Sequence, residues 1–199
     1  MNKGIIIAGG IVLFFLILLM NGCSSYNTMV TKNEDVTGKW QQVETQYQRR
    51  MDLIPNLVNT VSGYADFEKS TLTEIIDARS NATSIKLDPS KLDAESIAKF
   101  EKAQGAITGS LSRLMVVFER YPDLKAITNF QTLMKELEGT ENRIAESRRD
   151  FNLSAQDFNT YIKKFPTNLW AGMFNFEPRG YFESAEGADK APEVKFNSK

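Results

Sequence analysis

Between Ile127 and Phe165 the sequence carries an uninterrupted apolar repeat with a mean spacing of about 3.5 residues. A repeat of this period forms one continuous apolar stripe on a helix and imposes a left-handed supercoil with neighbouring helices. The stripe must be buried against partner helices along its whole length. This segment therefore predicts an all-α protein built from long helices. The positions in the repeat are Ile127, Phe130, Met134, Leu137, Glu141, Ile144, Arg148, Phe151, Ala155, Phe158, Ile162 and Phe165.

A second long helix is predicted over residues 35–84. Its apolar positions recur at alternating steps of three and four from Val36 onward, and they continue past Pro55. A proline inside a helix deletes one backbone hydrogen bond and usually kinks the helix. We therefore expect a bend near Pro55.

A third helix is predicted over residues 90–121, with Asp88 as its N-cap and Pro89 as its first helical residue. Gly105 and Gly109 lie beside its apolar stripe, which indicates that a neighbouring helix packs closely there. Pro122-Asp123 after this helix predicts a short joint, and short joints between helices produce antiparallel neighbours.

The N-terminal segment is apolar. Residues 4–30 carry no charge, and residues 5–20 are almost entirely aliphatic or aromatic. A membrane-spanning helix needs about 20 mostly apolar residues, whereas the core of a signal peptide needs roughly 7 to 15. We expect residues 1–25 to anchor the chain in a membrane, either as an uncleaved transmembrane helix (a signal-anchor) or as a lipoprotein signal with lipidation at Cys23. Lys3 favours a body outside the cytoplasm, in the periplasm.

The predicted fold is therefore all-α: an N-terminal membrane anchor helix over residues 1–25, followed by a bundle of about four long antiparallel helices over residues 26–165. Pro166 ends the last helix. Residues 166–183 are rich in aromatic side chains and should fold back over the open end of the bundle as an aromatic flap, with an exposed docking patch as the alternative. Residues 184–199 are polar and lack periodicity, which predicts a disordered tail.

Composition excludes several classes of function. The 24 Lys and Arg residues nearly balance the 25 Asp and Glu residues, and both signs are interspersed, so no basic surface for nucleic acid is expected. The chain has no histidine and a single cysteine, which removes the commonest general base, the commonest metal ligand and any disulfide within the chain. We expect no catalytic, metal or cofactor site, and a protein that is not an enzyme.

Charged residues interrupt the apolar stripes and form the candidate site. A charge removed from water without a partner costs several kcal/mol, so these side chains should pair with one another. A structural polar network that fixes helix register is the preferred interpretation, and a pocket that binds a carboxylate or phosphate through arginine is the alternative. At least one of the first two arginines should contact Glu141, and Arg148 is the other candidate. The residues are Arg50, Glu68, Arg79, Glu141 and Arg148.

Two blocks of the sequence resemble the LemA family. The first is residues 46–58 followed by Gly63-Tyr64-Ala65, and the second is Thr140-Glu141-Asn142-Arg143-Ile144 with Phe165-Pro166 further on. Proteins of this family resemble membrane-anchored bundles of long antiparallel helices without an established molecular function. The resemblance therefore implies a fold and a place in the bacterial cell envelope rather than a reaction.

The predicted function is that of a non-enzymatic, membrane-anchored scaffold or interaction protein of the bacterial cell envelope. The expected partners are the membrane and another protein, and coiled-coil stripes of this kind are compatible with oligomerisation. No nucleic acid and no cofactor are expected. The alternative is a small-molecule or anion-binding envelope module that uses the arginine-containing helix stripe.

Overall fold

The computed structural model describes residues 3–63, 69–121 and 127–183. Every secondary-structure element in these ranges is a helix, which confirms the predicted all-α class. A few side chains near the N-terminus are outside the description. They are those of Lys3, Ile5, Ile6, Ala8, Phe14, Phe15 and Leu18.

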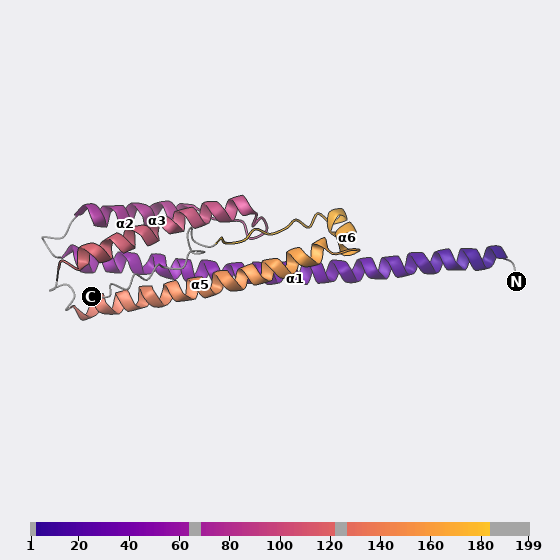
Figure 1. Ribbon diagram of the computed structural model, residues 1–199, viewed down its shortest axis with the longest axis horizontal. Helices are drawn as coiled ribbons and strands as arrows, with labels where there is room; N and C mark the ends of the chain where they lie inside the picture. Colours follow the sequence, from indigo (N-terminus) through magenta and orange to yellow (C-terminus); the bar gives the residue numbers. More distant parts are fainter. Residues whose placement is uncertain (1–2, 64–68, 122–126, 184–199) are drawn as a thin grey trace, which may run out of the picture.

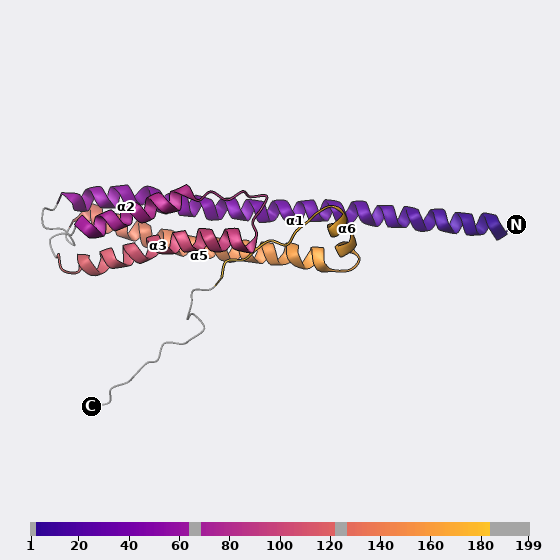
Figure 2. The ribbon, with the colours of Figure 1, turned by 90° about the horizontal axis from the view of Figure 1, so that it is seen from above.

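Helix α1 (Lys3–Ser62) is one continuous helix, so the expected anchor and the first helix of the bundle are not separate elements. No proline precedes Pro55 in the sequence, and the helix also continues through Pro55 itself. Its first part extends well beyond the other helices (Figures 1 and 2). The described apolar side chains of this projecting part are exposed: Ile7, Ile11, Val12, Leu13, Leu16, Ile17, Leu19 and Met20.

Within the described residues, none of the helices contains a stretch that is both long enough and apolar enough to cross a membrane. The transmembrane helix predicted within residues 1–25 is therefore not borne out. Part of that segment, including Ile5, Phe14 and Leu18, lies outside the described side chains.

Helix α5 (Thr128–Lys163) runs antiparallel to α1 along most of the bundle (Figures 1 and 2). The predicted apolar stripe faces α1 and the other helices over most of its length. Phe165 is an exception, because α5 ends at Lys163 and the Phe165 side chain is 80% exposed. The buried apolar positions of the repeat are Phe130, Leu137, Ile144, Phe151, Ala155, Phe158 and Ile162.

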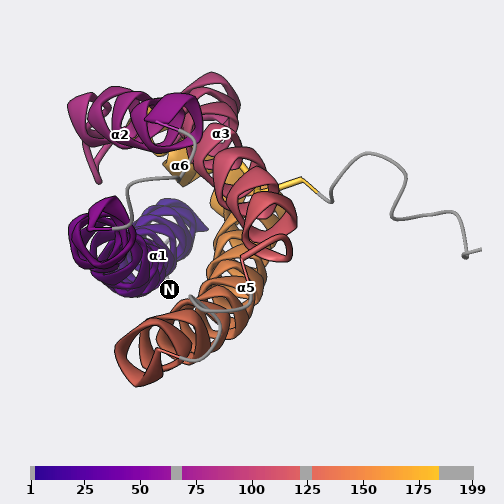
Figure 3. The same cartoon turned by 90° about the vertical axis from the view of Figure 1, so that its left-hand side faces the viewer.

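Helices α2 (Lys69–Ser84) and α3 (Ala94–Phe118) pack against each other as a second hairpin. Seen along the bundle, α3 lies between α2 and α5 (Figure 3). The predicted N-cap of α3 was wrong: the carboxylate of Asp93 accepts a hydrogen bond from the Ser96 backbone N–H, so the helix starts at Ala94. Asp88 instead closes a turn by accepting hydrogen bonds from Ser90.

The short helix α6 (Thr167–Met173) follows α5 at the end of the bundle from which α1 projects (Figure 1). Residues 174–183 then return along α5, where two asparagines of α5 hold their backbone. Asn159 donates to the Arg179 carbonyl and accepts from the Arg179 N–H, and Asn152 makes the same pair with Phe182. Each asparagine amide thereby satisfies one backbone N–H and one backbone carbonyl of a segment that is not helical. Residues 64–68, 122–126 and 184–199, which include the predicted tail, lie outside the described residues.

The buried apolar side chains form two clusters along the bundle. The α2 core contains Met51, Leu53, Ile54, Leu57, Val58 and Val61 of α1 with residues of α2, the second half of α3, and Phe130 and Leu137 of α5. The α6 core contains Met29, Val36, Trp40, Val43 and Tyr47 of α1 with Ile97 and Phe100 of α3, residues 144–162 of α5, Ala171 and Phe182.

Candidate functional site: a polar layer between two apolar cores

Arg50 lies on α1 at the boundary between the two cores. Tyr47, one helical turn earlier, belongs to the α6 core, and Met51 belongs to the α2 core. The three-four spacing of the apolar positions turns this side of α1 toward the other helices, so the arginine is carried inward with its neighbours. Only 1% of its surface is exposed.

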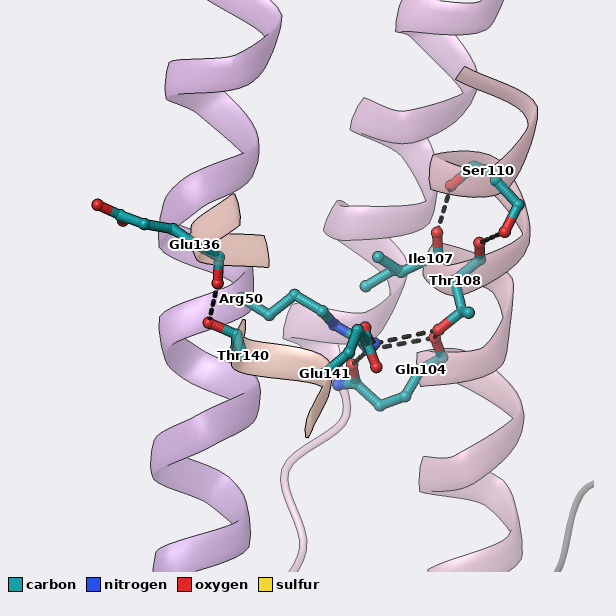
Figure 4. A network of polar contacts seen from close by, with 9 residues as sticks. Arg50, Gln104, Ile107, Thr108, Ser110, Glu136, Thr140 and Glu141 are labelled. Atoms are coloured by element: carbon teal, nitrogen blue, oxygen red, sulfur yellow. Dashed lines mark hydrogen bonds and ion pairs between the residues drawn. The ribbon is translucent and has the colours of Figure 1, made fainter. Parts of the chain in front are cut away.

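The guanidinium of Arg50 binds groups from two other helices (Figure 4). One terminal nitrogen, Nη1, lies 2.5 Å from Glu141 Oε1 on α5 and 3.1 Å from Thr108 Oγ1 on α3. The other, Nη2, donates to the side-chain oxygen of Gln104 at 2.5 Å and to its backbone carbonyl at 3.2 Å. Hydrogen bonds in which the donor carries a charge are roughly twice as strong as neutral ones.

These groups form a polar layer, which we define as Arg50, Gln104, Thr108 and Glu141. Gln104 lies between Phe100 of the α6 core and Ile107 of the α2 core, so α3 changes from one core to the other at the same level as α1. Sliding any one helix by a turn would leave the buried arginine without its partners, which costs several kcal/mol. The hydrogen bonds of Arg50 are therefore made at this relative alignment of α1, α3 and α5.

The layer is buried on one side and open on the other. The Arg50 side chain is 2% exposed, whereas that of Glu141 is 40% exposed. Arg50 Nε has no hydrogen-bond partner among the described residues. The guanidinium also lies 5.0 Å from the centre of the Tyr47 ring, and burial raises the pKa of the Tyr47 hydroxyl.

Arg79, the second arginine of the predicted network, has a different partner. Its Nε donates to the backbone carbonyl of Met51 at 3.0 Å. In an unbroken helix that carbonyl would accept from the N–H of residue 55, but Pro55 has none. Arg79 of α2 therefore satisfies the acceptor on α1 that the proline leaves free.

Arg148 does not contact Glu141 either. It pairs with Glu101 of α3, its Nη2 donates to the Glu183 carbonyl at 2.9 Å, and its guanidinium lies 4.7 Å from the Phe182 ring centre. The helical rise separates residues seven apart by about 10 Å, so the nearer carboxylate of α3 is preferred. Glu68, the remaining predicted member, lies outside the described residues.

The sequence profile of the LemA family matches residues 39–196. The chain belongs to the LemA family. The resemblance predicted from the two sequence blocks is thereby confirmed. The matched region includes the whole polar layer, α6 and the returning segment, whereas the projecting apolar part of α1 precedes it.

Proteins of similar sequence include magnetosome proteins and a protein named LemA. Magnetosome protein MamQ 2 of Paramagnetospirillum magneticum is 31% identical, over 90% of this chain and 71% of its own length. Magnetosome protein MamQ of Magnetospirillum gryphiswaldense is 30% identical over the same shares. Protein LemA of Metamycoplasma hominis is 26% identical, over 80% of this chain and 69% of its own.

Sequence reasoning missed two members of the layer in this LemA family chain, Gln104 and Thr108. Gln104 does carry a signal, because it is a polar residue at an apolar position of the repeat between Phe100 and Ile107. Thr108 carries none, since its hydroxyl also bonds its own helix at the Gln104 carbonyl, as threonines on helices often do.

A cleft of about 970 Å³ adjoins the layer between α1 and the connection from α2 to α3. Gln104, Tyr47 and Met51 line this cleft, and its charged lining residues include Glu44, Arg49 and Lys86. A smaller cleft of about 340 Å³ lies between α3 and α5 and includes Glu141 and Thr108. None of the three predicted arginines lines either cleft as far as the described residues extend.

The described residues contain no group of three or more Cys, Asp and Glu side chains arranged to hold a metal ion. The arrangement is instead suited to fixing helices relative to one another. Arg50, which is buried, is already paired with the Glu141 carboxylate. Its charge is therefore not available to a ligand.

Proposed function

We propose that this LemA family protein is a non-enzymatic scaffold of the bacterial cell envelope, attached to a membrane by the projecting part of α1 and presenting a rigid helical rod to a protein partner. The observation that carries the proposal is the set of exposed apolar side chains on residues 7–20, which extend beyond the bundle (Figure 1). Soluble proteins rarely expose a contiguous apolar surface of this kind, and such surfaces mark sites of membrane or protein association.

The polar layer supports the scaffold part of the proposal. Helices whose register is fixed by a buried charge resist sliding past one another. The length of the bundle and the set of side chains on its surface then stay constant. The alternative function, an anion-binding module, has less support because Arg50 is engaged by Glu141, Gln104 and Thr108 rather than facing an open cleft.

Fractionation of cells that produce the full chain tests the attachment. We expect the full chain in the membrane fraction and a chain lacking residues 1–25 in the soluble fraction, with helical circular dichroism preserved. The bundle should survive the deletion because Met29 is the first described residue of α1 in either apolar core. Recovery of the shortened chain with membranes to the same extent as the full chain, or loss of its helical signal, would contradict the proposal.

The location of the body outside the cytoplasm is part of the same proposal and rests on Lys3 preceding the apolar segment. A chain with Cys23→Ser and Ser112→Cys carries one exposed thiol on α3. A membrane-impermeant maleimide should label it in cells whose inner membrane is intact. Labelling only after that membrane is broken would place the body in the cytoplasm.

A further inference from the structure

The outer face of α6 carries an apolar stripe that nothing in the described residues covers. Leu169 and Met173 are spaced by one helical turn of α6, and Phe165, which precedes the helix, is a further exposed apolar side chain. Their side chains are 62%, 66% and 80% exposed, respectively. The opposite face, with Thr167 and Ala171, is buried against the bundle. The water-facing side of an ordinary surface helix is polar, so α6 has the reverse arrangement on its exposed side.

This stripe is held at a defined place on α1. The Trp170 ring packs directly over Gly22, where an added Cβ atom would lie 3.1 Å from it. Phe174, directly after α6, makes an edge contact with Tyr26 at 4.8 Å between ring centres. Met20, which is exposed and ends the projecting apolar part of α1, lies two residues before Gly22 and is therefore within a turn of the α6 contact.

The charges beside the stripe suit anionic lipid. Lys163 and Lys164 at the end of α5 are exposed and adjoin Phe165 in the sequence. Glu177, in the segment after α6, is one of three carboxylates that interact electrostatically with Arg179, together with Asp88 and Glu34. Aromatic residues flanked by lysine are characteristic of the region where lipid headgroups meet the hydrocarbon.

A lipid surface also fits the size of the stripe better than a second protein does. Stable protein interfaces bury about 800 Å² on each partner. One face of a helix of 7 residues is smaller than that. The contact of Trp170 with Gly22 places α6 beside the end of the exposed apolar part of α1, so one bilayer could cover both.

We propose that the outer face of α6 lies on the surface of the bilayer that holds α1, with Phe165, Leu169 and Met173 inserted at the level of the headgroups. This inference rests on the proposed membrane attachment. It adds a second point of contact, so that the long axis of the bundle is oriented relative to the membrane and does not pivot about α1 alone.

Depth-dependent fluorescence quenching of the full chain tests this contact. A chain with Cys23→Ser and Met173→Cys carries an environment-sensitive maleimide probe on the stripe. The matched control carries Val116→Cys, because Val116 is similarly exposed, at 63%, near the end of the bundle farthest from α6 (Figure 1). Leu169→Cys provides an independent position on the same stripe. Each chain is reconstituted in vesicles of phosphatidylcholine and phosphatidylglycerol with bromine at a chosen acyl depth.

We expect the probes at positions 173 and 169 to shift to shorter wavelength and to be quenched most by bromine near the headgroups, while the probe at position 116 is unchanged. If the chain floats with the vesicles but all three probes behave alike, the α6 contact is refuted and the attachment stands. A shift that depends on protein concentration and not on bromine would assign the stripe to a second copy and overturn the inference. Failure of the chain to float refutes the attachment and the inference together.

Discussion

At the scale of single residues, the unequal burial of Arg50 and Glu141 determines how much their ion pair contributes to the free energy of unfolding. An exposed ion pair contributes about 0 to 1 kcal/mol, and removal of one partner from a fully buried pair costs about 3 to 5 kcal/mol. The Glu141 side chain is 40% exposed while Arg50 is buried. Water that reaches the carboxylate therefore weakens the ion pair relative to a fully buried one. We expect Glu141→Gln to lower the free energy of unfolding by about 1 to 2 kcal/mol.

Urea melts of the bundle measure this change, with Glu138→Gln as the control, because Glu138 is exposed on the same helix. An unchanged midpoint for Glu141→Gln would show that the carboxylate does not balance the buried guanidinium. A loss as large as that of a dry pair would show that the rim excludes water.

Arg79 and Pro55 give a second prediction at the residue scale. Arg79→Met should cost about 1 to 3 kcal/mol, since it leaves the Met51 carbonyl without a donor. Pro55→Ala restores a backbone N–H in reach of that carbonyl, so Arg79→Met should cost much less in that background.

A double-mutant cycle in thermal unfolding measures the coupling, and Arg49→Met controls for loss of an exposed arginine on α1. Additive effects of Pro55→Ala and Arg79→Met would contradict the assignment, because they would mean that the two residues do not serve the same carbonyl.

Tyr47 predicts a dependence of stability on alkaline pH. Burial raises the pKa of its hydroxyl above the ordinary value of 10.0. Between that value and the raised pKa, the unfolded chain has lost the proton while the folded chain keeps it, so the free energy of unfolding falls as pH rises. Tyr47→Phe should flatten this decline, as measured by urea melts below and above about pH 10. Equal slopes for the two chains would indicate that the hydroxyl ionises freely in the folded state.

At the scale of elements, two glycines show that similar residues have opposite roles. Gly180 packs so closely on the start of α3 that an added Cβ atom would lie 2.7 Å from the Ala94 nitrogen. Gly105, by contrast, has no atom within 4 Å of that position, so the close helix packing predicted there and at Gly109 was wrong. α3 turns these glycines away from its neighbours.

Gly180→Ala should therefore loosen the returning segment and destabilise the protein by about 1 to 3 kcal/mol, since overpacking forces the backbone to shift. Gly105→Ala should stabilise it by up to about 1 kcal/mol through helix propensity. Hydrogen exchange at Gly180, whose N–H donates to the Leu92 carbonyl, reports the loosening directly. Unchanged protection of that amide in Gly180→Ala would show that the segment adapts without strain.

At the scale of the whole molecule, the attachment depends on whether α1 remains intact. Cys23 is exposed and lies inside the continuous helix, directly after the glycine that packs on Trp170. Cleavage before Cys23, as in a lipoprotein, would separate that glycine from α6. We expect Cys23→Ser to leave membrane attachment and chain length unchanged. Loss of a lipid-labelled band, together with accumulation of a longer precursor, would establish lipidation instead.

The sequence alone determined the helices and their buried faces, because both follow from the local period of apolar residues and the positions of proline. The repeat in α5 and the inward slots of Arg50 and Glu141 could be read in this way. The end of α5 could be read only approximately, and Phe165 was consequently placed on the buried stripe when it is exposed.

Only the tertiary structure decided which charges meet. The partners of Arg79 and Arg148, a backbone carbonyl and Glu101, depend on the axial offset between helices, which is the joint result of many contacts across the two cores. The position of α6 also depends on that offset, since Trp170 packs over Gly22 only when α1 and α5 are aligned along their lengths. Local periodicity contains no information on such an offset, because a shift of one whole turn leaves every apolar stripe facing its neighbour.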